Sequence, residues 1–343
     1  MSQSRKYIVC CLLALCLGFS AVGCVNDDTR LKDSVQIYPI SEMQAEADIA
    51  VCNYGFRSFD ANGDYLVLNT GARGLYLLNG HRIIKAVRRF QPLRHFRIVD
   101  HSVYMIVNGE FGTSLSGIQS YDWERNKFDV ILKDYYCSCF EADRDSLYIS
   151  VAPERMGIAK ERIKVPSGVY RYDFDTKEMS MILPKMTCNY MFIFQDKLYL
   201  QCETEKTDGF KSYVLLQYDI SSQKMLPERI TWEPRDNAWF PYSDEEIIMF
   251  RTDGTFWKYS FSGEREHLFT EETLPIVSIN GFASDGKTVY AKAVMQDASF
   301  QIIQIALDTY NTSVLYEAVP RIGGFVMQNH SLSYIGWMDN EGK

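Results

Sequence analysis

The sequence predicts an all-β protein, and more specifically a β-propeller of seven blades. Three observations support this prediction: a sequence unit that recurs about seven times, an alternation typical of strands within each unit, and many aromatic residues. Aromatic residues make up 14% of the 343-residue chain, which suits strands because flat rings pack well on pleated surfaces. A repeat of about 40 to 50 residues with several strands is typical of propeller blades, each a four-stranded antiparallel sheet.

The repeat is clearest at a residue pair in the second strand of each unit. These pairs recur every 38 to 51 residues. They are Tyr65-Leu66, Val103-Tyr104, Leu147-Tyr148, Leu198-Tyr199, Ile247-Ile248, Val289-Tyr290 and Leu332-Ser333.

The third unit illustrates the expected order of strands, named A to D from the channel outward. Strand A ends at Cys139–Ala142, and strand B follows as Ser146–Val151. Strands C and D are expected at Gly168–Phe174 and Glu178–Leu183. A Tyr-Asp pair closes strand C here and in two other units, and its aspartate is expected to cap the following turn. The three pairs are Tyr121-Asp122, Tyr172-Asp173 and Tyr218-Asp219.

The last unit is incomplete, because residues 323–337 supply only strands A and B. Near the N-terminus, the segment Ser34–Ile40 has the pattern of a strand without a neighbour in the sequence. Pairing the two would cover two exposed strand edges at once. We therefore expect the N-terminal strand to close the last blade, with six blades as an alternative if the last hairpin joins the first blade differently.

The first residues have the pattern of a secretory signal. Arg5 and Lys6 precede an apolar run at residues 8–22, which is shorter than the roughly 20 residues needed to cross a bilayer. The ending Ala21-Val22-Gly23-Cys24 resembles the bacterial lipobox. That resemblance implies cleavage before Cys24 and acylation of its thiol by palmitate-type chains. The alternative is an ordinary signal peptide with an incidental cysteine.

Three segments follow from this interpretation: a signal peptide at 1–23, a lipidated tether at 24–33 and a propeller at 34–343. We therefore expect an extracytoplasmic protein of the bacterial cell envelope, held to the membrane by its N-terminal lipid.

Five cysteines lie beyond the signal and Cys24, so at least one thiol is free. Cys188 and Cys202 flank a hairpin turn and would lie nearly opposite each other, which allows a disulfide. Buried or half-buried free thiols are the favoured alternative. The others are Cys52, Cys137 and Cys139. Cys137-Ser-Cys139 has no histidine-rich partner nearby, so we expect no metal and no cofactor.

The amino-acid sequence of the repeated strands also resembles that of a known family. The run Ser146–Val151 (SLYISV), then Gly168–Phe174 (GVYRYDF) and Asp175-Thr176-Lys177, is similar to TolB-like and lipoprotein-receptor-like (DUF5050-type) β-propellers of bacterial lipoproteins. The resemblance covers nearly the whole mature chain and implies the architecture. Propellers of this kind differ in function, so it implies little about activity.

Long connections are expected on one end of the propeller, where the B–C and D–A loops meet; we call this end the loop face. Cations and aromatic rings gather in these loops, and together they suit a carboxylate, phosphate or sugar ligand. The alternative is a solvated basic loop with aromatics buried between blades. The candidate ligand-binding residues are Arg89, Arg94, Tyr135, Tyr136, Arg155, Arg162, Trp232 and Arg235.

Charge and motifs narrow the function classes. The net charge of −8 argues against nucleic-acid binding, and no Gly-x-Ser-x-Gly or His-Glu-x-x-His motif is present. We therefore expect no catalytic residue, and a monomeric binding module or scaffold for a protein or an extracellular glycan or polyanion. The alternative is a tethered glycan-active hydrolase or lyase, which acids converging with His95 or an arginine at the channel mouth would favour.

Overall fold

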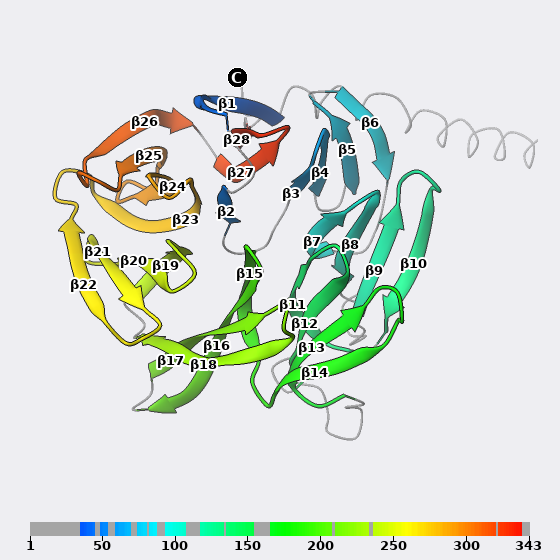
Figure 1. Cartoon of the computed structure of the whole chain (residues 1–343). Coiled ribbons are helices and arrows are strands. Elements are labelled where there is room, and N and C mark those ends of the chain that lie inside the picture. The colour runs from blue at the N-terminus through cyan, green and yellow to red at the C-terminus, as the bar shows by residue number, and fades with distance from the viewer. Residues whose placement is uncertain are drawn as a thin grey trace, which may run out of the picture.

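Seven β-sheets are arranged as blades around a central channel in the computed structural model (Figure 1). The structure describes residues 35–44, 49–53, 59–69, 74–80, 82–87, 93–107, 117–133, 135–153, 165–207, 210–232, 236–319 and 322–337. Within these ranges all regular elements are strands, and no helix there is long and apolar enough to cross a membrane. The prediction of seven blades is confirmed, and the six-blade alternative is wrong.

The first five blades each have four antiparallel strands in sequence order. Blade 1 contains β3 (Phe59–Asn62), β4 (Tyr65–Asn69), β5 (Leu75–Asn79) and β6 (Arg82–Val87). Blade 2 contains β7 (Leu93–Val99), β8 (Ser102–Val107), β9 (Gly117–Asp122) and β10 (Lys127–Leu132). Blade 3 contains β11 (Cys137–Ala142), β12 (Ser146–Val151), β13 (Gly168–Asp173) and β14 (Met179–Pro184). Blade 4 contains β15 (Cys188–Phe194), β16 (Lys197–Thr207), β17 (Phe210–Asp219) and β18 (Lys224–Trp232). Blade 5 contains β19 (Asp236–Pro241), β20 (Glu246–Arg251), β21 (Thr255–Ser260) and β22 (Arg265–Thr270).

The last two blades depart from this plan. Blade 6 has β23 (Ile276–Ser284), β24 (Thr288–Met295), β25 (Phe300–Ala306) and β26 (Thr312–Val319), with β2 (Ala50–Asn53) added at the inner edge. Blade 7 has β27 (Ile322–Gln328), β28 (Ser331–Trp337) and β1 (Val35–Gln44).

Ring closure occurs in blade 7, as the sequence predicts. β1 pairs antiparallel with β28, so that Val35 lies opposite Trp337, and Tyr38 stacks on Tyr334 with ring centroids 4.7 Å apart. Among the described residues this composite blade has three strands, two from the C-terminal segment and one from the N-terminal segment.

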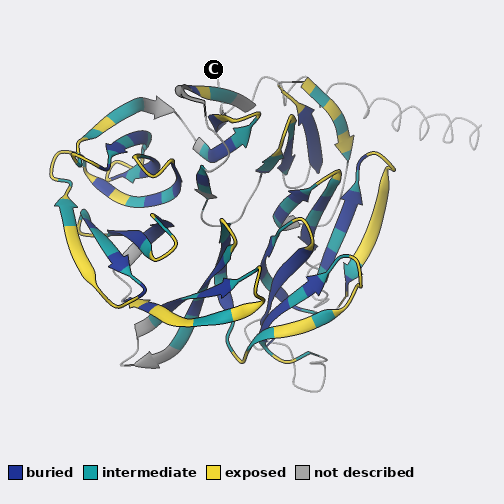
Figure 2. Cartoon of the chain, in the orientation of Figure 1, coloured by how far each residue is buried: buried dark blue, intermediate teal, exposed yellow. Residues whose placement is uncertain are grey.

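Within a blade, burial is greatest in strand B and lowest in the outermost strand, as β12 and β10 show. Strand B of each blade lies almost wholly in the core, as in β12, where all six residues are buried. The outer strand β10 is largely exposed, and the outer strand β6 alternates exposed and half-buried residues (Figure 2). Apolar side chains therefore pack mainly between neighbouring blades, and this packing fixes the inner strands around the channel.

The aspartates at the ends of the C strands cap turns, as predicted. The Oδ1 atom of Asp122 accepts the Arg125 N–H at 2.8 Å, and that of Asp173 accepts the Thr176 N–H at 2.9 Å. The third, Asp219, accepts the Ser222 N–H at 2.6 Å. These side chains satisfy backbone donors that the turn would otherwise leave to solvent.

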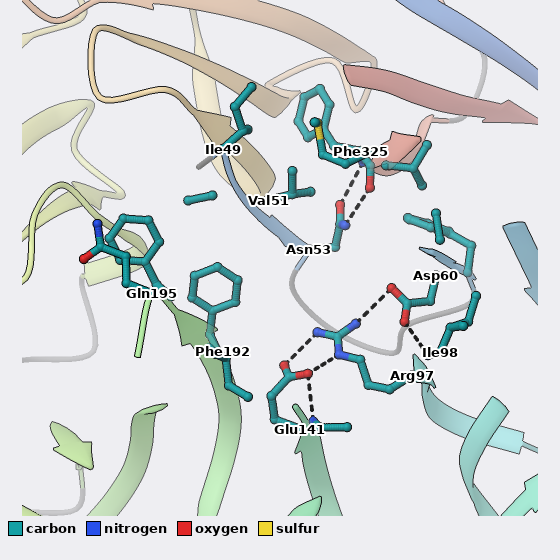
Figure 3. Close-up of a pocket in the computed structure, with 18 residues that line it drawn as sticks. Ile49, Val51, Asn53, Asp60, Arg97, Ile98, Glu141, Phe192, Gln195 and Phe325 are labelled. Carbon is teal, nitrogen blue, oxygen red and sulfur yellow. Dashed lines mark hydrogen bonds and ion pairs between the residues drawn. The ribbon is translucent and has the colours of Figure 1, made fainter. Parts of the chain in front are cut away.

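β2 is a strand that the sequence analysis did not predict, and it lies in the channel. Its backbone pairs with β23, the innermost strand of blade 6, with Val51 opposite Ala283. On its other side, the Asn53 carboxamide bonds to Phe325 of β27. Asn53 Nδ2 donates to the Phe325 carbonyl and Asn53 Oδ1 accepts the Phe325 N–H, both at 2.9 Å (Figure 3). β2 thus joins the inner edges of blades 6 and 7.

The contact between Asn53 and β27 requires a glycine beside it. A Cβ atom built on Gly324 would lie 2.2 Å from Asn53 Oδ1 and 2.5 Å from the ring of Phe59. Both distances are far below van der Waals contact, so only glycine allows β2, β3 and β27 to approach this closely.

Replacing Asn53 with alanine is expected to lower the free energy of unfolding by about 2–4 kcal/mol, because both the N–H and the carbonyl of Phe325 lose their partner. Asn53→Asp is the matched control: it keeps the acceptor, but an ionised carboxylate cannot donate to the Phe325 carbonyl. We expect this variant to recover stability below about pH 4, where a protonated carboxyl can donate. Urea denaturation at several pH values measures both effects, and equal stability of Asn53→Ala and the parent would contradict the bridging role.

Candidate functional site

A cavity of about 470 Å³ lies in the channel, bordered by β2 and by the inner strands of blades 1, 2, 3, 4 and 7. The residues that line it come from the last part of each inner strand, just before the A–B turn. The cavity is therefore near the end of the propeller opposite the loop face; we call this end the turn face.

One position of the repeat supplies the charged residues of the cavity. In blades 1, 2, 4 and 7 it is the third residue pair between strands A and B counted from the A–B hairpin, as in Arg97 with Tyr104. In blades 3, 5 and 6, where more residues separate the two strands, it is the second pair, as in Glu141 with Tyr148. Across the seven blades in order, the position holds Asp60, Arg97, Glu141, Phe192, Phe240, Ala283 and Val326. Blades 1 to 3 thus carry charges of alternating sign, and blades 4 to 7 carry apolar side chains.

The three charged residues form one ion cluster (Figure 3). Arg97 binds Glu141 through two nitrogens: Nε donates to Oε1, and Nη2 donates to Oε2 at 2.7 Å. Arg97 Nη1 also reaches Asp60 Oδ1 at the longer distance of 3.4 Å. A forked arginine–carboxylate pair of this kind fixes both side chains in direction.

Backbone N–H groups hold both carboxylates as well. Asp60 Oδ2 accepts the Ile98 N–H at 2.8 Å, and Glu141 Oε1 accepts the Ala142 N–H at 3.1 Å. Exposure differs between the two acids: the side chain of Glu141 is 4% exposed, whereas that of Asp60 is 20% exposed. Glu141 is therefore enclosed in the wall, while the Asp60 side chain is partly exposed and lines the cavity.

The rest of the lining is mainly apolar, with the carboxamides of Asn53 and Gln195 among it. Its apolar residues include Ile49 and Val51 beside or within β2, Phe192 of β15, and Phe325 and Val326 of β27. In Figure 3, Ile49, Val51 and Phe325 lie on the other side of the cavity from Arg97 and Glu141. A ligand here would meet charge on one side and hydrocarbon or aromatic surface on the other.

The residues predicted on the loop face are only partly described. Arg89, Arg155, Arg162 and Arg235 lie outside the described residues, as does the side chain of Arg94, whose backbone in β7 pairs with Ile106. The binding role of these residues stays a prediction.

The three predicted aromatic residues are described. Tyr135 is half-buried and packs against the core between blades 2 and 3, while Tyr136 and Trp232 are each only 5% exposed. The Trp232 ring stacks on Tyr213 with centroids 6.2 Å apart. Tyr136 and Trp232 therefore serve packing and offer little surface to a ligand.

Cys188 and Cys202 lie directly opposite each other on β15 and β16, as the sequence predicts. Their sulfur atoms are 2.7 Å apart and both residues are fully buried, and the structure has them as free thiols. Cys137 and Cys139 are also buried free thiols, and burial raises the pKa of Cys137 well above its usual range. Within the described part of the chain, no group of three or more His, Cys, Asp or Glu side chains could hold a metal ion.

Sequence reasoning missed the ion cluster and the Asn53 bridge. The sequence contains a signal for the cluster, because correct alignment of the A strands places Asp60, Arg97 and Glu141 at one position. No comparable signal marks Asn53, since its partner Phe325 is distant in sequence.

One comparison with a solved structure supports the architecture. The β-propeller domain of the Trilobed protease from Pyrococcus furiosus aligns with 85% of this chain and 97% of its own, with 12% identity and a TM-score of 0.53. BamB from Moraxella catarrhalis aligns with 91% of this chain and 96% of its own, with 14% identity and a TM-score of 0.48.

What the Pyrococcus domain shares with the chain is the propeller fold. The Pyrococcus propeller is described as having an open velcro topology, whereas here β1 and β28 pair to close the ring. No protein-family model and no curated protein matches the sequence.

Proposed function

We propose that this protein is an extracytoplasmic, membrane-anchored β-propeller that binds a protein or an acidic extracellular glycan and catalyses no reaction. The observation that favours binding over catalysis is the state of the two acids in the channel. Asp60 and Glu141 both accept hydrogen bonds from Arg97 and from a backbone N–H. Such a cluster holds the side chains of the cavity wall in fixed positions, whereas a glycosidase needs one carboxyl that can give up a proton.

The binding surface for the acidic ligand is proposed on the loop face, on the basis of its arginines. The test is a glycan and polyanion array with the full chain in detergent, beside the double variant Arg155→Ala/Arg162→Ala. Saturable binding that the double variant loses supports the loop face. If nothing on the array binds, capture of partners from envelope extracts tests the protein alternative, and recovery of no specific partner would contradict the proposal.

A tethered glycan-active enzyme is the second candidate, because two acids do converge on an arginine within the channel. Its test is hydrolysis or eliminative cleavage of envelope glycans by the parent chain and by Glu141→Gln. If the parent chain cleaves a glycan and the folded variant Glu141→Gln does not, this result would favour the enzyme and overturn the binding proposal.

Membrane attachment gives a separate prediction. Replacing Cys24 with serine removes the thiol that acylation needs, so the variant is expected to leave the membrane fraction while the propeller stays folded. Fractionation with a high-salt wash, together with circular dichroism, measures both outcomes. Persistence of Cys24→Ser in the washed membranes would show that the anchor is not a lipid on this cysteine.

A further inference from the structure

We propose that the channel cavity binds an organic cation: a primary ammonium or guanidinium group carried on an apolar stem. This site is separate from the loop face, since it lies near the A–B turns at the turn face. Its ligand has the opposite charge to the acidic ligand expected on the loop face.

The charge of the cavity favours a cation. Among the described residues that line it, Asp60 and Glu141 are acidic and Arg97 is basic, which leaves a formal charge of −1. Arg97 is forked onto Glu141 and makes only the longer 3.4 Å contact with Asp60. A carboxylate has about four acceptor positions, so Asp60 can accept a ligand ammonium in addition to its present donors.

Access and position support Asp60 as the anchor. Its side chain is 20% exposed and lines the cavity, so a ligand can reach the carboxylate without disturbing Glu141. The Ile98 N–H at 2.8 Å holds Asp60 Oδ2 in place, which lowers the entropic cost of binding.

The facing wall suits the stem of such a ligand. Val51 and Ile49 supply aliphatic surface, and Phe192 supplies a ring at the cavity edge. Cations bind favourably over aromatic faces, and more strongly when partly desolvated. The cavity volume of about 470 Å³ lies within the range of small-molecule sites.

Anions fit this cavity poorly. Arg97, the one basic side chain among its described lining residues, is flanked by two carboxylates that already bind it. An incoming carboxylate would displace one of these contacts and lie close to two like charges. The geometry thus discriminates by charge as well as by size.

The cation could be a free amine or a lysine side chain of an extended peptide, and the experiment separates these sources. Isothermal titration of the full chain in detergent uses phenethylamine, its anionic analogue 3-phenylpropionate, and the peptides acetyl-Ala-Lys-Ala-amide and acetyl-Ala-norleucine-Ala-amide. We expect saturable binding of phenethylamine or of the lysine peptide, and none of the anion or of the norleucine peptide. Binding of the amine alone assigns the site to small amines, and binding of the lysine peptide assigns it to a protein side chain.

Two variants place the binding in this cavity. Asp60→Asn keeps the shape and is expected to weaken cation binding at least tenfold, whereas Asp129→Asn, the same change on the exposed strand β10, leaves it unchanged. Phe192→Leu removes the ring without altering charge and is expected to weaken binding by a few-fold, which tests the site even if Asp60→Asn fails to fold.

Several results would overturn the inference: no cation binding at millimolar concentration, equal binding of amine and anion, or full affinity in both Asp60→Asn and Phe192→Leu. The loop-face variant Arg155→Ala/Arg162→Ala should bind the cation normally. Failure of the cation site therefore stays distinguishable from failure of the proposed function.

Discussion

Replacing Arg97 with methionine is expected to lower the free energy of unfolding by about 3–5 kcal/mol, the cost of leaving a buried charge without its partner. Methionine retains most of the apolar stem but removes every guanidinium contact. Glu141, which is only 4% exposed on its side chain, would then lie in the channel wall without the cation that neutralises it. Denaturation by urea, monitored by tryptophan fluorescence, measures the loss.

Two controls separate this effect from simple truncation. The double variant Arg97→Met/Glu141→Met removes both buried charges and should recover most of the stability, since apolar replacements of a whole buried ion pair are often neutral. Lys127→Met breaks the exposed pair with Asp129, where the Lys127 side chain is 64% exposed, and should cost less than about 1 kcal/mol. A loss in Arg97→Met as small as that of Lys127→Met would show that the cluster contributes little to the fold.

Lys292 gives the second large effect, and this one depends on pH. Its ammonium lies in blade 6, donates to the Gly323 carbonyl at 3.2 Å and sits 5.3 Å from the centre of the Phe300 ring. Burial lowers the pKa of Lys292 from 10.5 to about 8. Between these two values the unfolded chain binds more protons than the folded chain, so stability is expected to rise with pH across this window.

Lys292→Met is therefore expected to raise the free energy of unfolding by about 3 kcal/mol at pH 7, because it removes the cost of burying the charge. The difference from the parent should shrink above pH 8 and vanish near pH 10.5, where lysine is neutral in both states. The matched control is Lys287→Met, at an exposed position of the same blade, which should change stability by less than about 0.5 kcal/mol. A gain in Lys292→Met that does not vary with pH would mean that packing, not charge, accounts for it.

Local signals were enough to predict most of the architecture. The repeated strand pairs and turn aspartates are encoded within each unit, so seven blades and their capped turns could be read from one sequence. Ring closure by Ser34–Ile40 could be predicted by counting strands. The C-terminal unit is an incomplete blade, and the N-terminal strand has no neighbour in the sequence, so each can complete the other. The facing positions of Cys188 and Cys202 followed from the hairpin between them.

Features that depend on tertiary contacts were not predicted. β2 is only four residues long and has no repeat partner, and its place is fixed by pairing with β23, which is far along the chain. The ion cluster is hidden for a different reason: the pair Tyr65-Leu66 is one residue out of register with the equivalent pairs of the other blades. In blade 1 the register places Leu66-Val67 where Tyr65-Leu66 was expected, which hides the equivalence of Asp60 with Arg97.

Closure of the ring by β1 and β28 has a consequence for how the chain folds. Val35 and Trp337 lie near opposite ends of the described chain, so this ladder closes the longest loop among the described strand pairings. The entropic cost of closing a loop of this length is on the order of 5 kcal/mol. The chain meets this cost before the hydrogen bonds of the ladder form and offset it. We expect blades 1 to 6 to form from local hairpins, while β1 pairs later with β28, the most C-terminal of the described strands. The slowest step of folding would then be the joining of the two termini, and its rate should fall in variants that weaken the Tyr38–Tyr334 stack.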